Sequence, residues 1–179
     1  DIGANIGIHA LNFSCAAKNG LVISFEPQPE TFRLLEKNIF QNNVKNIIPL
    51  NLAIYDRAAI TDFYVMSDDA YSSLIHTGRK KLENKIKVLC TGVDDLLGEI
   101  DVDFVKIDVE GLEFNVLKSM KTLLKRCKPV IFCEIYKGKI ESHNPLEIIN
   151  FVKDMGYSAF RIIDGEMVEF QTGHLHEDR

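Results

Sequence analysis

The chain opens on Asp1-Ile-Gly-Ala-Asn-Ile-Gly7, a glycine-containing turn that leads directly into a helical pattern. Apolar residues recur at helical spacing from Ile6 to Ala17, which predicts a helix immediately after the turn. Almost nothing that could form a strand precedes Asp1. We therefore expect Asp1 to stand at the end of a truncated first central strand, with most of that strand and any targeting segment upstream of the sequence.

Strand-like and helical patterns alternate after this turn. Short β-rich runs predict strands at residues 21–25, 47–50, 59–66, 86–91, 103–108 and 129–135. Helices are predicted at residues 6–18, 29–41, 112–125 and 145–155. Repeated β-α units predict an α/β fold in which a mostly parallel sheet is covered by helices on both faces. Residues 157–163 and 167–170 predict a closing antiparallel hairpin, and the polar residues 67–84 predict an insertion or lid.

Composition restricts the class of protein. The 179 residues are 46% apolar and carry a formal net charge of -5, which predicts one soluble domain over residues 1–179 and makes nucleic acid a poor default partner. Uncharged apolar runs are far shorter than the roughly 20 residues of a membrane span, so no such span is expected. The four cysteines are dispersed among apolar neighbours without zinc-site spacing, which predicts buried thiols in a reducing compartment, the cytoplasm.

Acidic residues fall at the carboxyl ends of the predicted strands: Asp1, Glu26, Asp108 and Glu134. In a parallel sheet these ends meet at one edge, where ligands bind. Any one of these acids alone is better explained as a helix cap or as a partner for a lysine. A buried carboxylate is costly unless something binds it, so the set of acids predicts a site for a polar ligand.

The first turn indicates what kind of ligand this is. A dinucleotide-binding G-x-G-x-x-G pattern starting at Gly3 would need glycine at positions 5 and 8, which hold Asn5 and Ile8. An acid just before the turn repels a pyrophosphate and suits a cationic or amino group. Glu26 lies 19 residues beyond Gly7, where a carboxylate accepts hydrogen bonds from ribose hydroxyls. A nucleoside with an ammonium group and no phosphate, such as S-adenosylmethionine, fits both positions.

Further phrases follow the turn in a fixed order: Phe25-Glu-Pro27, Asn38 with Asn42, Asn51-Leu-Ala53, and Val105-Lys-Ile-Asp-Val-Glu-Gly111 with Glu113. In order and spacing, over roughly residues 1–134, the turn and these phrases resemble the FkbM-like family of S-adenosylmethionine-dependent methyltransferases. The resemblance implies a class I methyltransferase fold, which is a Rossmann-like three-layer sandwich with a mostly parallel seven-stranded sheet. It also implies methyl transfer to an oxygen, commonly a hydroxyl of a sugar, polyketide or other secondary metabolite, but it does not name the acceptor.

The same resemblance implies roles for individual residues. Gly3, Asn5 and Gly7 are expected around the methionine part of the cofactor, and Glu26 on the ribose. Asn51 and Ala53 are expected near the adenine, although an ordinary turn after a strand would look identical.

Methyl transfer from a sulfonium needs alignment of acceptor and donor, and a base where the acceptor is a poorly acidic hydroxyl. Asp108 and Glu110 are the leading candidates for that base, and Asp108 could instead orient the cofactor's amino group. A divalent cation held by these acids with Glu134 is the weaker alternative, so no metal site is predicted. His143, in a loop before a helix, is a further candidate base, with a solvated loop histidine as the alternative.

The sequence therefore predicts an O-methyltransferase acting on a hydroxyl of a small molecule, sugar or glycan. An RNA ribose 2'-O-methyltransferase is an alternative, suggested by Lys106, Asp108 and the cluster Arg79-Lys-Lys81 and opposed by the net charge. A non-catalytic binding module that keeps the cofactor fold is a third reading, because fold does not guarantee activity.

Overall fold

The computed structural model describes residues 1–135 and 144–171. The chain forms two compact units, residues 1–136 and residues 137–179. The first unit contains the β-α units and every motif quoted above, and the second contains a helix and a hairpin. The single domain predicted over residues 1–179 stays a prediction.

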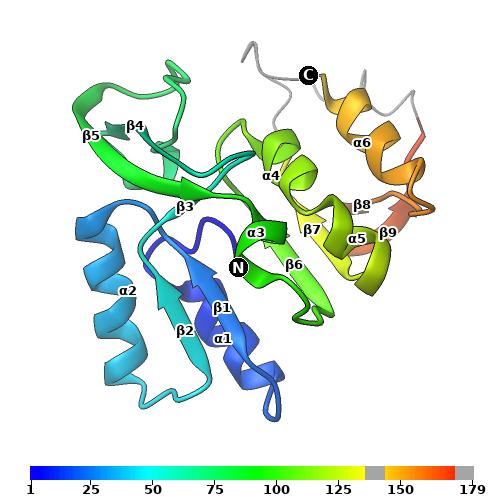
Figure 1. Ribbon diagram of the computed structural model, residues 1–179, viewed down its shortest axis with the longest axis horizontal. Helices are drawn as coiled ribbons and strands as arrows, with labels where there is room; N and C mark the ends of the chain where they lie inside the picture. Colours follow the sequence, from blue (N-terminus) through cyan, green and yellow to red (C-terminus); the bar gives the residue numbers. More distant parts are fainter. Residues whose placement is uncertain (136–143, 172–179) are drawn as a thin grey trace. The chain divides into compact units, whose positions relative to one another are not determined.

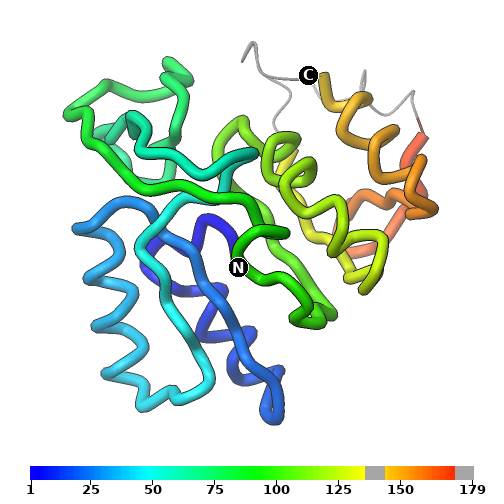
Figure 2. Tube along the Cα trace, viewed as in Figure 1, coloured from blue at the N-terminus to red at the C-terminus, as the bar shows by residue number. Residues whose placement is uncertain are grey.

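A parallel array of strands lies at the centre of the first unit (Figure 1). Strand β1 (Val22–Phe25) pairs in parallel with β2 (Ile47–Leu50), and β6 (Phe104–Ile107) pairs in parallel with β7 (Val130–Cys133). Ile2 forms parallel bridges to Phe25 on one side and to Ile107 on the other. The N-terminal segment therefore lies between β1 and β6, as the trace in Figure 2 shows, and joins the two pairs.

Two helices pack on the β1–β2 pair. Helix α1 (Ile8–Ala16) begins directly after the first turn, and α2 (Pro29–Gln41) has proline at its first position, where the missing N–H costs no helical hydrogen bond. Residues of both helices and both strands form one apolar cluster together with Ala4; the others are Ala10, Val22, Leu35 and Ile47. These bounds confirm the helices predicted at residues 6–18 and 29–41 to within two residues at each end.

A second, mixed sheet departs from the predicted β-α repeat. Strand β5 (Leu82–Thr91) pairs in parallel with β3 (Ala53–Ile54) and antiparallel with β4 (Ala59–Met66). The chain between β4 and β5 contains only the short 3-10 helix η1 (Asp69–Tyr71) and no crossover helix, so the two strands return antiparallel. Strand β5 also starts four residues earlier than predicted, which shortens the predicted insertion.

The helix predicted at residues 112–125 is two helices, α4 (Glu113–Ser119) and α5 (Lys121–Cys127). The chain breaks at Met120 because a residue far away in sequence caps the second helix. Asp94, in α3 (Val93–Leu97), accepts hydrogen bonds from the backbone N–H groups of Thr122 and Leu123 at 2.7 and 2.9 Å. A cap of this kind stabilises the start of a new helix, and no local pattern predicts it.

The second unit contains α6 (Pro145–Lys153) and an antiparallel hairpin of β8 (Phe160–Ile163) and β9 (Glu166–Glu169). Asn144 caps α6 by accepting a hydrogen bond from the Leu146 N–H at 3.0 Å. Asp164 and Gly165 form the hairpin turn, both with positive φ, as a type I′ turn requires. The predicted closing hairpin is confirmed.

The α/β class predicted from the sequence is confirmed, but the described residues do not form a single seven-stranded parallel sheet. They form two parallel pairs bridged by Ile2, a mixed three-stranded sheet and a separate hairpin. Within residues 1–135 and 144–171, no helix is long and apolar enough to cross a membrane. All four cysteines are free, and Cys15 is exposed, which corrects the prediction that every thiol is buried.

Gly3 is the residue that allows the N-terminal segment to sit between β1 and β6. Its φ is +78°, and a Cβ there would overlap the carbonyl oxygen of Asp108. We expect Gly3→Ala to lower the free energy of unfolding by about 2–5 kcal/mol, combining backbone strain and overpacking. Gly78→Ala is the matched control, because Gly78 also has a positive φ, of +68°, but open space around it. Denaturant unfolding followed by circular dichroism measures both, and equal losses would contradict the role of the close approach.

Candidate functional site

The site is built where the N-terminal segment meets the carboxyl ends of β1 and β6. The backbone N–H of Ile2 donates to the Lys106 carbonyl at 2.9 Å, and the Asp108 N–H donates to the Ile2 carbonyl at 3.1 Å. On the other side, the N–H groups of Gly3 and Ala4 both donate to the Phe25 carbonyl, at 3.1 and 2.9 Å. This backbone network brings the first turn, the end of β1 and the end of β6 to one place.

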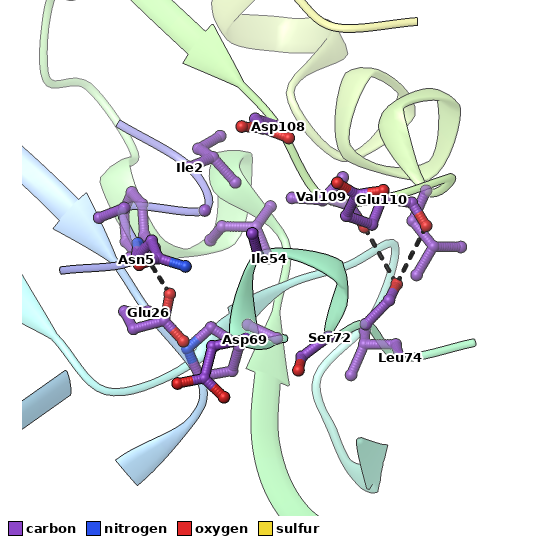
Figure 3. A pocket seen from close by; sticks show the side chains of 18 of the residues that line it. Ile2, Asn5, Glu26, Ile54, Asp69, Ser72, Leu74, Asp108, Val109 and Glu110 are labelled. Atoms are coloured by element: carbon purple, nitrogen blue, oxygen red, sulfur yellow. Dashed lines mark hydrogen bonds between the residues drawn. The ribbon is translucent and has the colours of Figure 1, made fainter. Parts of the chain in front are cut away.

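A cavity of about 320 Å³ opens at this place (Figure 3). Of the residues predicted to form the site, those that line it are Gly3, Asn5, Glu26, Ala53, Asp108 and Glu110. Asp1, Gly7 and Asn51 are not among the lining residues, and His143 lies outside the described residues. Most of the predicted constellation is therefore brought together around one volume.

Glu26 is the most deeply buried acid of the cavity wall, with 6% of its surface exposed. Its two carboxylate oxygens accept hydrogen bonds from the backbone N–H groups of Asn5 and Gln28, both at 2.9 Å. Burial raises the pKa of Glu26 to about 7, the nearby Asp69 adds to the rise, and the two N–H donors oppose it. The two N–H groups thus hold the Glu26 carboxylate in a fixed position, and further hydrogen-bond donors would stabilise its charged form.

The two residues predicted near an adenine differ in position. Asn51 donates hydrogen bonds from its side-chain amide to the carbonyls of Glu26 and Pro27, at 2.8 and 3.1 Å, and so holds the loop after β1. Ala53 lines the cavity beside Leu52 and Ile54. The apolar wall after β2 is therefore formed by residues 52–54, while Asn51 supports the loop that carries Glu26.

Lys106 carries the buried positive charge of the site. Its side chain is 4% exposed, and its Nζ donates to the Gly3 carbonyl at 2.9 Å. The same Nζ lies 3.5 Å from Oδ1 of Asp1 and 3.4 Å from Oδ2 of Asp108. Both oxygens of Asp1 are buried and accept no hydrogen bond within the described part of the chain, so Lys106 supplies the charge that balances them.

Glu110 stands in a strained turn at the end of the β6 segment. Its φ is +56°, a left-handed conformation that non-glycine residues rarely adopt and that clusters at functional sites. Its carboxylate forms an ion pair with the guanidinium of Arg79. Burial raises the pKa of Glu110 to about 7, against the lowering effect of Arg79, and Asp108, Glu134 and Glu113 raise it further.

The chain between β4 and β5 completes the wall with residues that the sequence did not single out as site residues: Asp69, Ala70, Ser72, Ser73 and Leu74. Ser73 is 2% exposed, and its hydroxyl donates to the carbonyls of Val109 and Glu110 at 3.0 and 3.3 Å. Asp69 accepts hydrogen bonds from the side chains of Gln28 and Thr31. The polar character of this stretch was the only sequence signal, and it predicted a lid without assigning contacts.

His9 also lines the cavity. It is exposed and stacks on Phe13, with ring centroids 5.9 Å apart. Glu134, the fourth of the predicted acids, is exposed and does not line the cavity. No group of three or more His, Cys, Asp or Glu side chains in the described ranges is arranged to hold a metal ion.

Residues 1–159 match the family model described as the methyltransferase FkbM domain. The chain belongs to the FkbM methyltransferase family. This membership confirms the resemblance drawn from the first turn and the phrase around Asp108.

Similar proteins agree with this membership. The chain is 32% identical over 141 residues to a hexuronic acid methyltransferase, AglP, of Haloferax volcanii, covering 77% of this chain and 55% of that protein. It is 26% identical to Methyltransferase 1 of Beauveria bassiana, covering 67% and 57% of the two chains. A crystal structure of an FkbM methyltransferase from Methylobacillus flagellatus shares the fold, with a TM-score of 0.66 at 16% identity over 93% of this chain and 40% of that one. The chain thus spans just over half the length of these curated relatives.

The buried Glu26 makes the stability of this FkbM domain depend on pH. A carboxyl whose pKa rises from 4.5 to about 7 on folding does not lower the free energy of unfolding below pH 4.5, because it is protonated in both states. Between pH 4.5 and 7 the unfolded state releases this proton more readily than the folded state, so the free energy of unfolding falls as the pH rises. Compared with Glu26→Gln, the wild-type free energy of unfolding should fall by up to about 3 kcal/mol across this window. Urea unfolding at several pH values measures the difference, with exposed Glu30→Gln as control. Parallel curves for wild type and Glu26→Gln would contradict the burial argument.

Lys106 should be indispensable to the fold of the site. Replacing it with methionine leaves the buried Asp1 carboxylate without a counter-charge, so we expect a loss of about 3–5 kcal/mol in the free energy of unfolding. Lys37→Met, on the exposed face of α2, should change stability by less than about 0.5 kcal/mol. The double variant Lys106→Met/Asp1→Asn should recover part of the loss, and strictly additive losses would rule out the ion pair between Lys106 and Asp1.

Proposed function

We propose that the protein is an S-adenosylmethionine-dependent O-methyltransferase that transfers a methyl group to a hydroxyl of a small molecule, sugar or glycan. The observation that carries the proposal is the cavity at the carboxyl ends of β1 and β6, with Glu26 buried in its wall. Membership of the FkbM family supports a methyl donor as its ligand.

The charge of the cavity wall supports a cationic nucleoside. Among the described residues, four acids line it, Glu26, Asp69, Asp108 and Glu110. The one lysine or arginine among these lining residues, Lys106, is already engaged by carboxylates and a carbonyl. Such a wall repels phosphates and favours a ligand with a net positive charge. The sulfonium and ammonium groups of S-adenosylmethionine meet this requirement, and the sulfonium supplies the methyl group when the cofactor is bound.

Individual residues have matching roles in this proposal. Glu26 accepts hydrogen bonds from the ribose hydroxyls while Asn5 and Gln28 hold its carboxylate in place. The turn containing Gly3 and Asn5 surrounds the methionine part, and Gly7 closes that turn. Residues 52–54 give the adenine an apolar surface. Asp1 does not line the cavity and acts through Lys106, with which its carboxylate is paired.

Asp108 and Glu110 are the proposed bases for the acceptor hydroxyl. Asp108 lines the cavity with its side chain 32% exposed, and Glu110 has a pKa of about 7, near the value at which a general base works best. Asp108 serves alternatively to orient the cofactor's amino group. His143 stays a proposed base outside the described residues.

A sugar acceptor is supported by the relative from Haloferax volcanii, whose name gives hexuronic acid as its substrate. The acid-lined cavity gives an RNA backbone no attraction, which argues against the ribose 2'-O alternative. A product methylated on a hydroxyl is an ether and survives mild alkali, whereas a methyl ester does not. Mass spectrometry of the alkali-treated product therefore tests the proposed acceptor group.

Cofactor binding gives the direct test of the Glu26 role. We expect S-adenosylhomocysteine to bind the wild type, and Glu26→Ala to weaken binding roughly 10- to 100-fold, because each charge-assisted hydrogen bond is worth about 1.5–3 kcal/mol. Affinity should also fall below pH 7 as Glu26 takes up a proton. Isothermal titration calorimetry measures both, with exposed Glu30→Ala as the control. A wild type that does not bind this ligand would refute the enzyme reading and favour a non-catalytic module.

Turnover separates the two roles open to Asp108. If Asp108 is the base, Asp108→Asn lowers kcat by about 10²- to 10⁴-fold and leaves S-adenosylhomocysteine affinity nearly unchanged. If it orients the cofactor, affinity falls with kcat. Asp103→Asn, an exposed position just before β6, is the control for loss of an acid nearby. Wild-type turnover in Asp108→Asn would remove the residue from both roles.

A further inference from the structure

Residues 67–81, here called the rim segment, are fastened to the turn that carries Glu110. Ser73 in this segment donates its hydroxyl to the carbonyls of Val109 and Glu110, and Arg79 pairs with the Glu110 carboxylate. The backbone of Ser73 is also hydrogen-bonded to that of Tyr64 in β4. The rim segment is therefore part of the cavity wall, and its side chains reach the group proposed as base.

The rim segment brings positive charge to an otherwise acidic site. Arg79 lies with its guanidinium carbon 4.4 Å from the centroid of the Tyr71 ring, and the Nζ of Lys80 lies 4.7 Å from the same centroid. Both cations are thus held on one aromatic ring, which limits their conformational freedom. The Arg79 side chain is 22% exposed, so solvent and ligands reach it while it contacts Glu110.

An ion pair of this kind is suited to exchange one carboxylate for another. A guanidinium carries five N–H donors in a planar fork and binds carboxylates with matched geometry. Arg79 already holds one carboxylate, that of Glu110, at the edge of the cavity. The acids of the cavity wall repel an anionic acceptor, so such an acceptor needs a cation positioned beside the reacting centre.

We propose that Arg79 binds a carboxylate of the acceptor, in exchange with Glu110, and that the acceptor class is therefore sugars bearing a carboxylate, the uronic acids. This inference rests on the proposed function and adds to it the residue that selects the acceptor. Lys80, whose Nζ also lies over the Tyr71 ring, adds to the attraction without the planar fork.

The test compares two ligands that differ only in the carboxylate, methyl β-D-glucuronide and methyl β-D-glucoside. Binding to the full-length protein is measured by saturation-transfer NMR titration, with and without S-adenosylhomocysteine. We expect the wild type to bind the glucuronide about tenfold or more tightly than the glucoside. Arg79→Gln should remove this preference, Arg79→Lys should keep a reduced one, and Lys81→Gln, an exposed lysine of the same segment, should retain it.

Glu110→Gln provides an independent reading that does not depend on how well the Arg79 variant folds. Removing the competing carboxylate should tighten glucuronide binding several-fold, and Arg79→Gln in the same background should abolish the gain. Equal binding of the two ligands by the wild type, or an unchanged preference in Arg79→Gln, overturns the inference. Calorimetry with S-adenosylhomocysteine on the same samples separates this failure from failure of the proposed function, which is absence of cofactor binding.

Discussion

The structure depends on the backbone of residues 1–4 lying between β1 and β6. Each parallel pair, β1–β2 and β6–β7, has only four residues per strand, and such short pairs are marginal alone. The hydrogen bonds of Ile2, Gly3 and Ala4 reach both pairs and align their carboxyl ends. The close approach requires glycine at position 3, because a Cβ would overlap the Asp108 carbonyl. The same contact that completes the sheet thus positions Glu26 and Asp108 around one cavity.

A buried charge network reinforces this backbone contact. Lys106 links the Gly3 carbonyl to the carboxylates of Asp1 and Asp108, so the turn and the end of β6 are tied by side chains as well as by main chain. Buried ion pairs contribute little net stability, but they penalise any arrangement that separates the partners. The network therefore mainly fixes the geometry of the site. It holds together the first turn and the end of β6, which are far apart in the sequence.

Local sequence patterns predicted the helices and strands well where the spacing of apolar residues within an element determines how it packs. Strand β4 has the predicted bounds, and α2 ends where Asn42 and Asn43 follow it. Predictions were wrong where a distant residue decides the structure. Asp94 splits the predicted helix at Met120 by capping α5, and β3 is too short, at two residues, to leave a pattern of its own.

The same distinction holds for the candidate site. Acids at strand ends were predictable because parallel strands share an edge. Of the four predicted, Glu26 and Asp108 line the cavity, whereas Asp1 and Glu134 do not; Glu110, predicted as a candidate base, also lines it. The sequence predicted residues 67–84 as an insertion or lid but did not predict their contacts, because Ser73 and Arg79 act on residues more than 30 positions away along the chain. The sequence also did not predict that the Asn51 side chain holds the Glu26 loop, and its expected place near an adenine stays a prediction.

The left-handed backbone at Glu110 bears on how this domain tolerates change. Glycine adopts such a conformation without steric cost, so a glycine at this position would relieve strain and favour the folded state by up to about 1 kcal/mol. It would also delete the carboxylate that faces Arg79. Selection for thermal stability alone would therefore favour variants that fold better but lack the Glu110 carboxylate at the site. A library of stabilised variants of this domain has to keep Glu110 unchanged.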